Sequence, residues 1–383
     1  MDMPPTARAL HIGIAGAGLL GRLMAWALSR QGHRVEVFDP APHAHPAHDG
    51  HGAAGFTAAG MLSPLAELDA AEPDVAGRGW QSIAHWAAIT QALARRVAPP
   101  HFAQHGSLMV AHGADLGAAR RVLGRLTQPM PGQPDHAQPQ ALSPDQLHAL
   151  EGDLHGSNGP LHAWLLPGEA HIDAVATMQA LHDDARDVQW HWAQPVQALG
   201  PHTLQLRGEQ GARDFDLVLD VRGTGARPDL PVRGVRGEVV WLHAPGVRLS
   251  RPVRLLHPRH RVYIVPRPGE RVLIGASEIE SEDRSPMSLR SAVELMAAAH
   301  SILPALAEAR ILRLDTNLRP ALPDHRPRLH VEPGLVRLNG LYRHGWLLAP
   351  AWVDDALRAL GQAGLPRASA PATTLSSPPT AQA

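Results

Sequence analysis

Apolar and polar positions at the start of the chain predict a strand, a helix and a second strand. Residues 10–15 form an apolar run suited to a buried strand, and an Ala/Leu-rich helical segment extends to residue 31. Residues 34–39 alternate between polar and apolar side chains and predict the second strand. Between the first strand and the helix, residues 16–21 have the sequence Gly-Ala-Gly-Leu-Leu-Gly, the G-x-G-x-x-G turn of a βαβ unit.

The residue types of this turn suit a dinucleotide. Gly16 permits the tight turn, Gly18 lets the backbone approach a pyrophosphate, and Gly21 lets the helix pack close to the strand. The helix N-terminus offers free N–H groups and a partial positive charge to the phosphates. Asp39, at the end of the second strand, is placed to accept a hydrogen bond from a ribose hydroxyl. The unit therefore predicts a bound dinucleotide and leaves NAD(P) and FAD both open.

The rest of the chain alternates between helical and sheet-forming patterns. Apolar residues near a 3.6-residue period predict helices at 80–97, 288–306 and 346–360. Pro350 is expected in the first turn of the last helix, where proline is tolerated. Residues 126–144, rich in Pro and Gln, predict a loop region. Strands are expected at residues 106–110, 188–199, 214–221, 237–242, 261–265, 271–274 and 335–338, with a turn at 267–270 that makes 261–265 and 271–274 a hairpin.

Dinucleotide-type elements thus recur at the start, middle and end of the chain, with sheet-forming segments between them. An NAD(P) domain is expected as one contiguous block, so this interleaving favours a flavoprotein. The predicted fold class is α/β: an FAD-binding, Rossmann-like, doubly wound domain with an inserted antiparallel-sheet substrate domain. The predicted boundaries are 1–90, 145–230 and 315–365 for the FAD-binding domain, 91–144 and 231–314 for the substrate-binding domain, and 366–383 for a disordered tail.

Composition removes several classes of function. The net charge of −1 gives no reason to expect a nucleic acid or an anionic membrane surface as partner. No apolar run is long enough to span a bilayer and residues 1–9 lack a secretory apolar region, so we expect a soluble cytoplasmic protein. The absence of cysteine excludes disulfides, thiolate catalysis, cysteine-ligated zinc and cysteinyl attachment of a cofactor. All 35 basic residues are arginine, which excludes a Schiff-base lysine and a P-loop lysine.

Residues 41–52 form a histidine-containing loop after the second predicted strand. The spacing of its histidines is similar to that of a metal-binding segment; they are His43, His45, His48 and His51. The loop has no carboxylate cluster and no fixed geometry, so a solvated loop is the preferred interpretation and no metal is predicted.

Four segments together resemble the D-amino-acid oxidase family and, within it, the glycine oxidases of thiamine biosynthesis. They are residues 10–39, Ala-Ala-Gly-Met-Leu at 58–62, Tyr-Ile-Val-Pro-Arg at 263–267, and the pair at 318–324 and 341–350. The resemblance runs from about Leu10 to Leu360. It implies non-covalent FAD, oxidation of glycine or a small amine to an imine and then an oxo acid and ammonia, peroxide from molecular oxygen, and a homo-oligomer.

The resemblance also implies roles for particular residues. Arg319 would pair with the substrate carboxylate, Tyr263 would give its hydroxyl to the same carboxylate, and Arg343 would lie beside substrate and flavin as a second cationic group. The helix that opens at Trp346 would direct its N–H groups at the flavin pyrimidine, and Val196 would offer its backbone to the adenine. The implied cofactor-binding residues are Gly16, Gly18, Leu19, Leu20, Gly21, Asp39, Ala54, Gly55, Ala59, Gly60, Met61, Val196, His344, Gly345, Trp346 and Leu347. No general base is expected, because the flavin accepts the electrons.

The chain departs from the family pattern in three places. Asn317 stands where glycine is usual, Arg222 is bulky at a strand end where small residues normally face the cofactor, and residues 327–330 lack the usual glycine-containing ending. Three alternatives therefore stay open: an oxidase of sarcosine, another secondary amine or a D-amino acid; an NAD(P)-dependent dehydrogenase; and a flavin-binding regulatory module with little catalysis.

Overall fold

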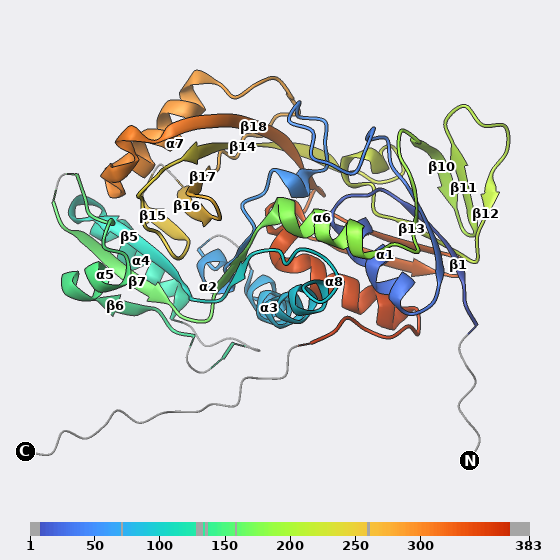
Figure 1. Ribbon diagram of the computed structural model, residues 1–383, viewed down its shortest axis with the longest axis horizontal. Helices are drawn as coiled ribbons and strands as arrows, with labels where there is room; N and C mark the ends of the chain where they lie inside the picture. The colour runs from blue at the N-terminus through green and yellow to red at the C-terminus, as the bar shows by residue number, and fades with distance from the viewer. Residues whose placement is uncertain are drawn as a thin grey trace, which may run out of the picture.

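The computed structural model describes residues 8–69, 72–127, 133–134, 137–157, 159–258 and 261–367, and it is organised around two large sheets (Figure 1). The first two residues of the predicted tail still contact the folded chain. His85 Nδ1 lies 2.9 Å from the carbonyl oxygen of Pro366, and Arg367 pairs with Asp354 at 2.8 Å. The rest of that tail, 368–383, lies outside the described residues, as do 128–132 and 135–136 of the predicted loop at 126–144.

The first sheet has six strands in the order β19–β20–β13–β1–β2–β9, and all neighbours are parallel except β19 and β20. Its strands come from the start, the middle and the end of the chain, as the interleaved pattern predicted. The α/β fold class is confirmed. The strands are β1 (His11–Ala15), β2 (Arg34–Phe38), β9 (Gln189–His191), β13 (Leu217–Asp220), β19 (Arg328–Glu332) and β20 (Leu335–Asn339).

Helices cover one face of this sheet and a small sheet covers the other (Figure 1). On the helical side, Ile12 and Ile14 of β1 pack in one core with buried residues of the helices α1, α3, α6 and α8. On the opposite side, Phe38 and Phe215 pack against the small sheet β10–β11–β12. These elements are α1 (Leu19–Arg30), α3 (Pro73–Leu93), α6 (Ala174–Asp184), α8 (Gly345–Ala359), β10 (Val196–Gly200), β11 (Thr203–Leu206) and β12 (Arg213–Asp214).

The second sheet has eight strands in the order β18–β14–β17–β16–β15–β5–β7–β6 and is antiparallel except between β15 and β5. Helix α7 (Leu289–Ile302) packs against it, and the predicted hairpin at 261–274 is present as β16 and β17. Strand β7 lies in this sheet although it falls within the predicted 145–230 segment, and the division into domains stays a prediction. The strands are β5 (Ser107–His112), β6 (Gln140–Leu142), β7 (Leu161–Leu166), β14 (Arg233–His243), β15 (Val253–Leu256), β16 (Arg261–Arg267), β17 (Arg271–Gly275) and β18 (Arg310–Ala321).

Short elements join the two sheets. A third small sheet has the order β3–β8–β4, and helix α2 directly follows β3. Within the described residues, no helix combines the length and the apolar character needed to cross a bilayer. The short elements are β3 (Met61–Leu62), α2 (Pro64–Glu67), β4 (Phe102–Ala103), α4 (Leu116–Leu126), α5 (Pro144–Leu150), β8 (Ala170–Ile172), and the 3₁₀ turns η1 (Ala54–Phe56), η2 (Gly113–Asp115), η3 (Gly223–Ala226), η4 (Pro304–Glu308) and η5 (Tyr342–His344).

Two predicted elements differ from the structure. The single strand expected at 188–199 is two strands, β9 and β10, in different sheets. The chain turns between them at Ala193, whose φ of 55° lies in the left-handed region and whose N–H donates to the Ala41 carbonyl. The helix expected from residue 80 begins at Pro73, because proline is compatible with a first helical position and Asp74 favours the first turn.

Pro350 does not lie in the first turn of its helix, as had been predicted. Helix α8 begins at Gly345, so Pro350 is its sixth residue. Proline has no N–H, and the carbonyl of Trp346 one turn earlier therefore loses its helical partner. The buried indole Nε1–H of Trp86, on α3, donates to that carbonyl at 2.8 Å. A tertiary contact thus replaces the hydrogen bond that local sequence removes.

Glu169 is a fully buried carboxyl between β7 and β8. It accepts hydrogen bonds from the Ala66 N–H at 2.9 Å and from the Ser107 hydroxyl, and so ties α2 to β5. Burial raises the pKa of Glu169 to about 7, although these hydrogen bonds oppose the rise. The Glu169 carboxyl group is therefore neutral in the folded protein over a pH range in which the same group is already ionised in the unfolded chain.

Gly21 is predicted to be indispensable for the packing of α1 on β1. A Cβ at this position would lie within 3.0 Å of the Gly16 carbonyl oxygen. We expect Gly21→Ala to lower the free energy of unfolding by about 1–3 kcal/mol, measured by chemical denaturation. Gly124→Ala is the control, because a Cβ at this position of α4 would meet no described residue outside its own helix turn within 4 Å. It should stabilise by about 0.5–1 kcal/mol through helix propensity. Stabilisation by both changes would contradict the packing argument.

Glu169 is predicted to weaken the protein as pH rises. Its folded pKa of about 7 exceeds the ordinary value of 4.5, so ionisation favours the unfolded chain above 4.5 and the penalty is complete above about 7. Glu169→Gln stays neutral at every pH. The difference in the free energy of unfolding between this variant and the wild-type protein should therefore increase by roughly 2 kcal/mol in favour of the variant from pH 5 to pH 8. Denaturation at both pH values measures the difference. Glu308→Gln, at an exposed side chain, should show no such gain, and an E169Q curve parallel to the wild-type curve would overturn the prediction.

Candidate active site

A cavity of about 1120 Å³ is lined by both large sheets. The parallel sheet contributes the ends of β1, β2 and β13 through Gly16, Asp39 and Arg222. These are carboxyl ends of neighbouring parallel strands, where doubly wound folds bind their ligands. The antiparallel sheet contributes Tyr263 from β16 and Arg319 from β18. The two sheets together therefore enclose one site.

Of the residues that the sequence assigned to the site, all but Gly21 line this cavity. Gly21 lies behind the wall against Gly16, where its role is in packing. The fold thus brings residues near position 16 together with residues near position 345. The lining residues among the predicted set are Gly16, Gly18, Leu19, Leu20, Asp39, Ala54, Gly55, Ala59, Gly60, Met61, Val196, Tyr263, Arg319, Arg343, His344, Gly345, Trp346 and Leu347.

Two helix N-termini open onto the cavity. Helix α1 begins after Gly18 and α8 begins after His344, and neither has a side-chain cap or an acidic residue in its first turn. Their first N–H groups and the positive ends of their dipoles are therefore available to a ligand in the cavity. One long ligand with acceptor groups at separated points suits this arrangement.

The Asp39 carboxylate holds the glycine turn in place. It accepts hydrogen bonds from the Ala17 N–H at 2.6 Å and from the Ala41 N–H at 2.8 Å. A carboxylate has about four lone-pair sites, so Asp39 can still accept a hydroxyl from a ligand. Its predicted role toward a ribose stays a prediction.

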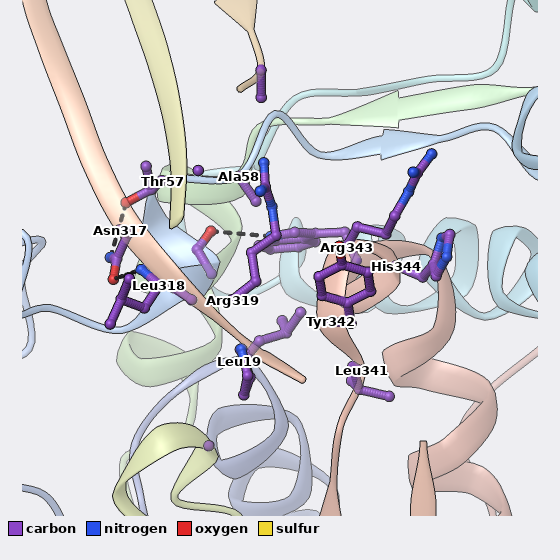
Figure 2. A pocket seen from close by; sticks show the side chains of 18 of the residues that line it. Leu19, Thr57, Ala58, Asn317, Leu318, Arg319, Leu341, Tyr342, Arg343 and His344 are labelled. Carbon is purple, nitrogen blue, oxygen red and sulfur yellow. Dashed lines mark hydrogen bonds between the residues drawn. The ribbon is translucent and has the colours of Figure 1, made fainter. Parts of the chain in front are cut away.

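Arg319 reaches from β18 toward the middle of the pocket, between Asn317 and Leu318 on one side and Tyr342 on the other (Figure 2). Its guanidinium donates to the carbonyl of Arg236 at 3.3 Å and to that of Ser277 at 3.1 Å. Among the described residues, no carboxylate lies within ion-pair distance of it. A full positive charge is therefore available to an anionic ligand.

Glycines make room for the two principal polar side chains. A Cβ at Gly237 would lie within 3.0 Å of the Arg319 guanidinium, and one at Gly275 would lie within 3.0 Å of the Tyr263 hydroxyl. Burial raises the pKa of Tyr263, so the phenol stays protonated and can donate. Neither glycine was singled out from the sequence. The available signal was a glycine at the end of a predicted strand: Gly237 begins the one at 237–242 and Gly275 follows the one at 271–274.

Arg343 is paired on both sides. Its guanidinium donates to Glu67 at 2.9 Å and to Glu278 at 3.2 Å. Glu67 also binds Arg254 at 2.9 Å, and although burial opposes it, the charges of Arg254 and Arg343 hold the pKa of Glu67 well below its usual range. Arg343 therefore lines the cavity as part of an ion-pair network, and its predicted role as a second cation beside the substrate stays a prediction.

Three lining residues of this network were missed from the sequence. Tyr342 donates its hydroxyl to Glu278 at 2.8 Å, and both tyrosines of the chain therefore face the same cavity. The scarcity of tyrosine was the available signal for Tyr342. Glu67 and Glu278 carried no local signal, because each is defined by partners distant in sequence.

The departures at Asn317 and Arg222 have structural partners. The Asn317 side-chain amide donates to the Gly52 carbonyl at 3.1 Å and to the Thr57 hydroxyl at 3.0 Å, which fastens the 52–57 segment to β18 (Figure 2). Arg222 binds both oxygens of Asp220, at 2.8 and 2.9 Å, and its side chain is 8% exposed. Its charge is turned toward that carboxylate.

Arg267 supports the small-residue stretch at 58–61. The buried guanidinium donates to the Ala59 carbonyl and, at 2.9 Å, to its own neighbour Pro266. Burial lowers the pKa of Arg267 to about 10, so it remains charged at neutral pH. Gly60 has a φ of 61° and lies against the Ile172 carbonyl, where a Cβ would collide. The stretch is therefore held rigidly along the cavity wall.

The histidine loop has no metal-site geometry. Across the ranges that the structure describes, no group of three or more His, Cys, Asp or Glu side chains is placed to hold a metal ion. His43, His45, His48 and His51 are exposed, and His48 lies 3.3 Å from Asp315.

Comparison with known proteins agrees with this geometry. The family model of FAD-dependent oxidoreductases (DAO) matches residues 11–353. A Rhizobium etli protein provisionally named thiamine biosynthesis oxidoreductase ThiO is 38% identical over 352 residues, which cover 92% of this chain and 96% of that protein. The glycine oxidase of Geobacillus kaustophilus is 25% identical over 364 residues, which cover 88% of this chain and 89% of that enzyme.

Solved structures share the fold. The crystal structure of glycine oxidase from Geobacillus kaustophilus has a TM-score of 0.77 and 24% identity, and the match covers 93% of this chain and 96% of that one. Iminodiacetate oxidase from Chelativorans sp. BNC1 has a TM-score of 0.77 and 23% identity, with coverage of 92% and 96%. At these identities the likeness shows the fold.

The family match decides between the nucleotide cofactors. The alternative of an NAD(P)-dependent dehydrogenase is wrong, because the matching family depends on FAD. The resemblance seen in the sequence is confirmed over most of the chain. The chain belongs to the DAO family of FAD-dependent oxidoreductases, with homologues among the ThiO proteins and the glycine oxidases.

Proposed function

We propose that the chain is an FAD-dependent amino-acid oxidase of the glycine oxidase type. It oxidises glycine or a similarly small amine to the imine, and the electrons reduce molecular oxygen to hydrogen peroxide. The observation that carries the proposal is Arg319, a cation without a carboxylate partner among the described residues, in a cavity that both sheets line. An arginine in this state suits the carboxylate of an amino acid.

The cavity residues fit a non-covalently held FAD. At the end near Asp39, the free N–H groups of α1 suit a diphosphate and the backbone at Val196 suits an adenine. At the other end, the rigid stretch at 58–61 and the N-terminus of α8 suit the flat ring system. When bound, FAD supplies the acceptor for a hydride equivalent. The fit rests on this chain's own backbone donors and small residues.

The protein groups position the substrate. Arg319 can hold both carboxylate oxygens with its planar guanidinium, which fixes the direction of the Cα–H bond. Tyr263, protonated because burial raises its pKa, donates a further hydrogen bond to the same carboxylate. The amine must lose its ammonium proton before it reacts, and no side chain is assigned as the base. The role of the protein is thus orientation and charge balance.

The product is released as an imine that water converts to the oxo acid and ammonia. The name of the Rhizobium etli relative supports a second outcome, in which the imine passes to a thiazole-forming step of thiamine biosynthesis. Both outcomes follow the same oxidation step, so the site does not distinguish them.

Arg319→Ala is expected to remove turnover and to leave the flavin bound. Loss of a charged partner for the substrate carboxylate should lower kcat/KM about 10²–10³-fold. Steady-state peroxide production measures the loss, and the flavin absorbance of the purified variant measures cofactor retention. Arg310→Ala, an exposed arginine on the same strand, is the control and should match the wild-type enzyme. Unchanged kinetics in R319A would rule out the assignment.

Anaerobic titration of the flavoprotein with glycine, sarcosine and D-alanine tests the substrate class. Bleaching of the flavin absorbance should be fastest with glycine. A preference for sarcosine or D-alanine would replace glycine by the corresponding alternative. Bleaching by none of the three would sink the amine oxidase proposal and support a flavin-binding module with little catalysis.

A further inference from the structure

Glu278 is a carboxylate on the same cavity wall as Arg319, beyond ion-pair distance of the Arg319 guanidinium but close enough for its charge to lower the pKa of Glu278. The segment from Gly275 to Glu278 begins at the last residue of β17 and ends on the cavity wall. Gly275 lies beneath the Tyr263 hydroxyl, and the carbonyl of Ser277 accepts from Arg319 at 3.1 Å. The next residue along the chain is Glu278, so the same cavity wall carries a negative charge within electrostatic range of the cation that suits a substrate carboxylate.

The Glu278 carboxylate has capacity to bind a further donor. One oxygen accepts from the Tyr342 hydroxyl at 2.8 Å and the other from Arg343 at 3.2 Å, and the side chain is 42% exposed. Each carboxylate oxygen can accept more than one hydrogen bond. Burial raises the pKa of Glu278, but Arg343 and the Tyr342 hydrogen bond outweigh it and the net direction is downward. Glu278 therefore stays ionised and is a counter-charge rather than a proton acceptor.

The other acidic side chains on the wall are committed elsewhere. Asp39 is bonded to the glycine turn at the far end of the cavity. Glu67 is 14% exposed and is enclosed by Arg254, Arg343 and His344. Asp69 follows α2 and lies near Arg125 of α4, which donates to its carbonyl and is 3.8 Å from its carboxylate. Among the described lining residues, Glu278 is thus the acid within electrostatic range of Arg319 with lone pairs to offer.

We propose that Glu278 determines specificity by pairing with the substrate ammonium while Arg319 pairs with the substrate carboxylate. The two opposite charges select a small zwitterion. Glu278 and Glu67 together occupy Arg343, which withholds a second cation from ligands that carry two carboxylates. This inference rests on the proposed function, because it assumes an amino-acid substrate at Arg319. A simple acid has no ammonium to pair with Glu278, and a diacid finds no second free cation, so the site would bind both more weakly than a zwitterion.

The test compares three ligands on the holoenzyme and on Glu278→Gln. Glycine is the zwitterion, glycolate has one carboxylate and no amine, and malonate has two carboxylates. In E278Q, the dissociation constant of glycine, taken from the concentration dependence of anaerobic flavin reduction, should rise roughly tenfold. Glycolate binding, followed by flavin absorbance, should change less than about threefold. Malonate should bind roughly tenfold more tightly, because Arg343 loses one of its two carboxylate partners.

The pH dependence provides a readout that a merely structural role would not move. A carboxylate beside the bound amine favours its protonated form, so its removal should shift the apparent pKa of flavin reduction by glycine downward by about one unit. Glu278→Asp keeps the charge and should restore part of the glycine preference. Glu280→Gln is the matched control two residues further along the chain. Glu280 is 61% exposed and pairs with Arg233, and neither residue lines the cavity.

The outcomes separate this inference from the proposed function. Reduction of the wild-type flavin by glycine, with unchanged constants and pH profile in E278Q, would overturn the role of Glu278 and leave the oxidase proposal intact. Parallel changes for all three ligands would indicate a distorted pocket and would also overturn it. Failure of every amine to reduce the wild-type flavin would overturn the proposed function itself.

Discussion

Close approach at a few glycines is the constraint on which both halves of the cavity depend. Helix α1 lies against β1 because Gly21 faces the Gly16 carbonyl without a side chain between them. On the opposite wall, Gly237 and Gly275 leave the space that the Arg319 guanidinium and the Tyr263 hydroxyl occupy. Any Cβ at these positions would collide with backbone or with a polar group. The site therefore depends on glycine at the positions where a side chain would collide with the backbone or with a functional group.

Four arginines of the cavity wall differ in how their charge is compensated. Arg222, Arg254 and Arg343 have carboxylate partners and act as structural ion pairs. Arg319 rests on two carbonyl oxygens, which hold its direction without neutralising it. A guanidinium that is oriented and has no carboxylate within ion-pair distance can form a direct pair with an incoming carboxylate. The buried pairs around it serve to keep the other charges occupied.

Helix α8 shows how the site and the core are coupled. Its N-terminus opens onto the cavity, whereas Pro350 removes a hydrogen bond one turn further on. The indole of Trp86 replaces that bond from α3 and so fixes α8 against its neighbour. Asn317 and Arg267 hold the facing segments at 52–57 and 58–61 in a similar way. Each cavity wall is thus held by a side chain from a distant part of the chain.

The sequence by itself determined the βαβ unit, the α/β class and the family, because glycine spacing and apolar periodicity are local properties. All of its assigned site residues except Gly21 line the cavity. The sequence did not determine where Pro350 falls, the break between β9 and β10, or the pairing of Arg343, since these depend on contacts with residues far along the chain. Glu278 is the clearest case. The residues around it in the sequence form no recognisable motif. Only tertiary packing brings its carboxylate to the Tyr342 hydroxyl and onto the cavity wall that Arg319 also lines. Long-range electrostatics cannot be predicted from local pattern, because the energy of a charge depends on which partners the fold brings within a few ångströms.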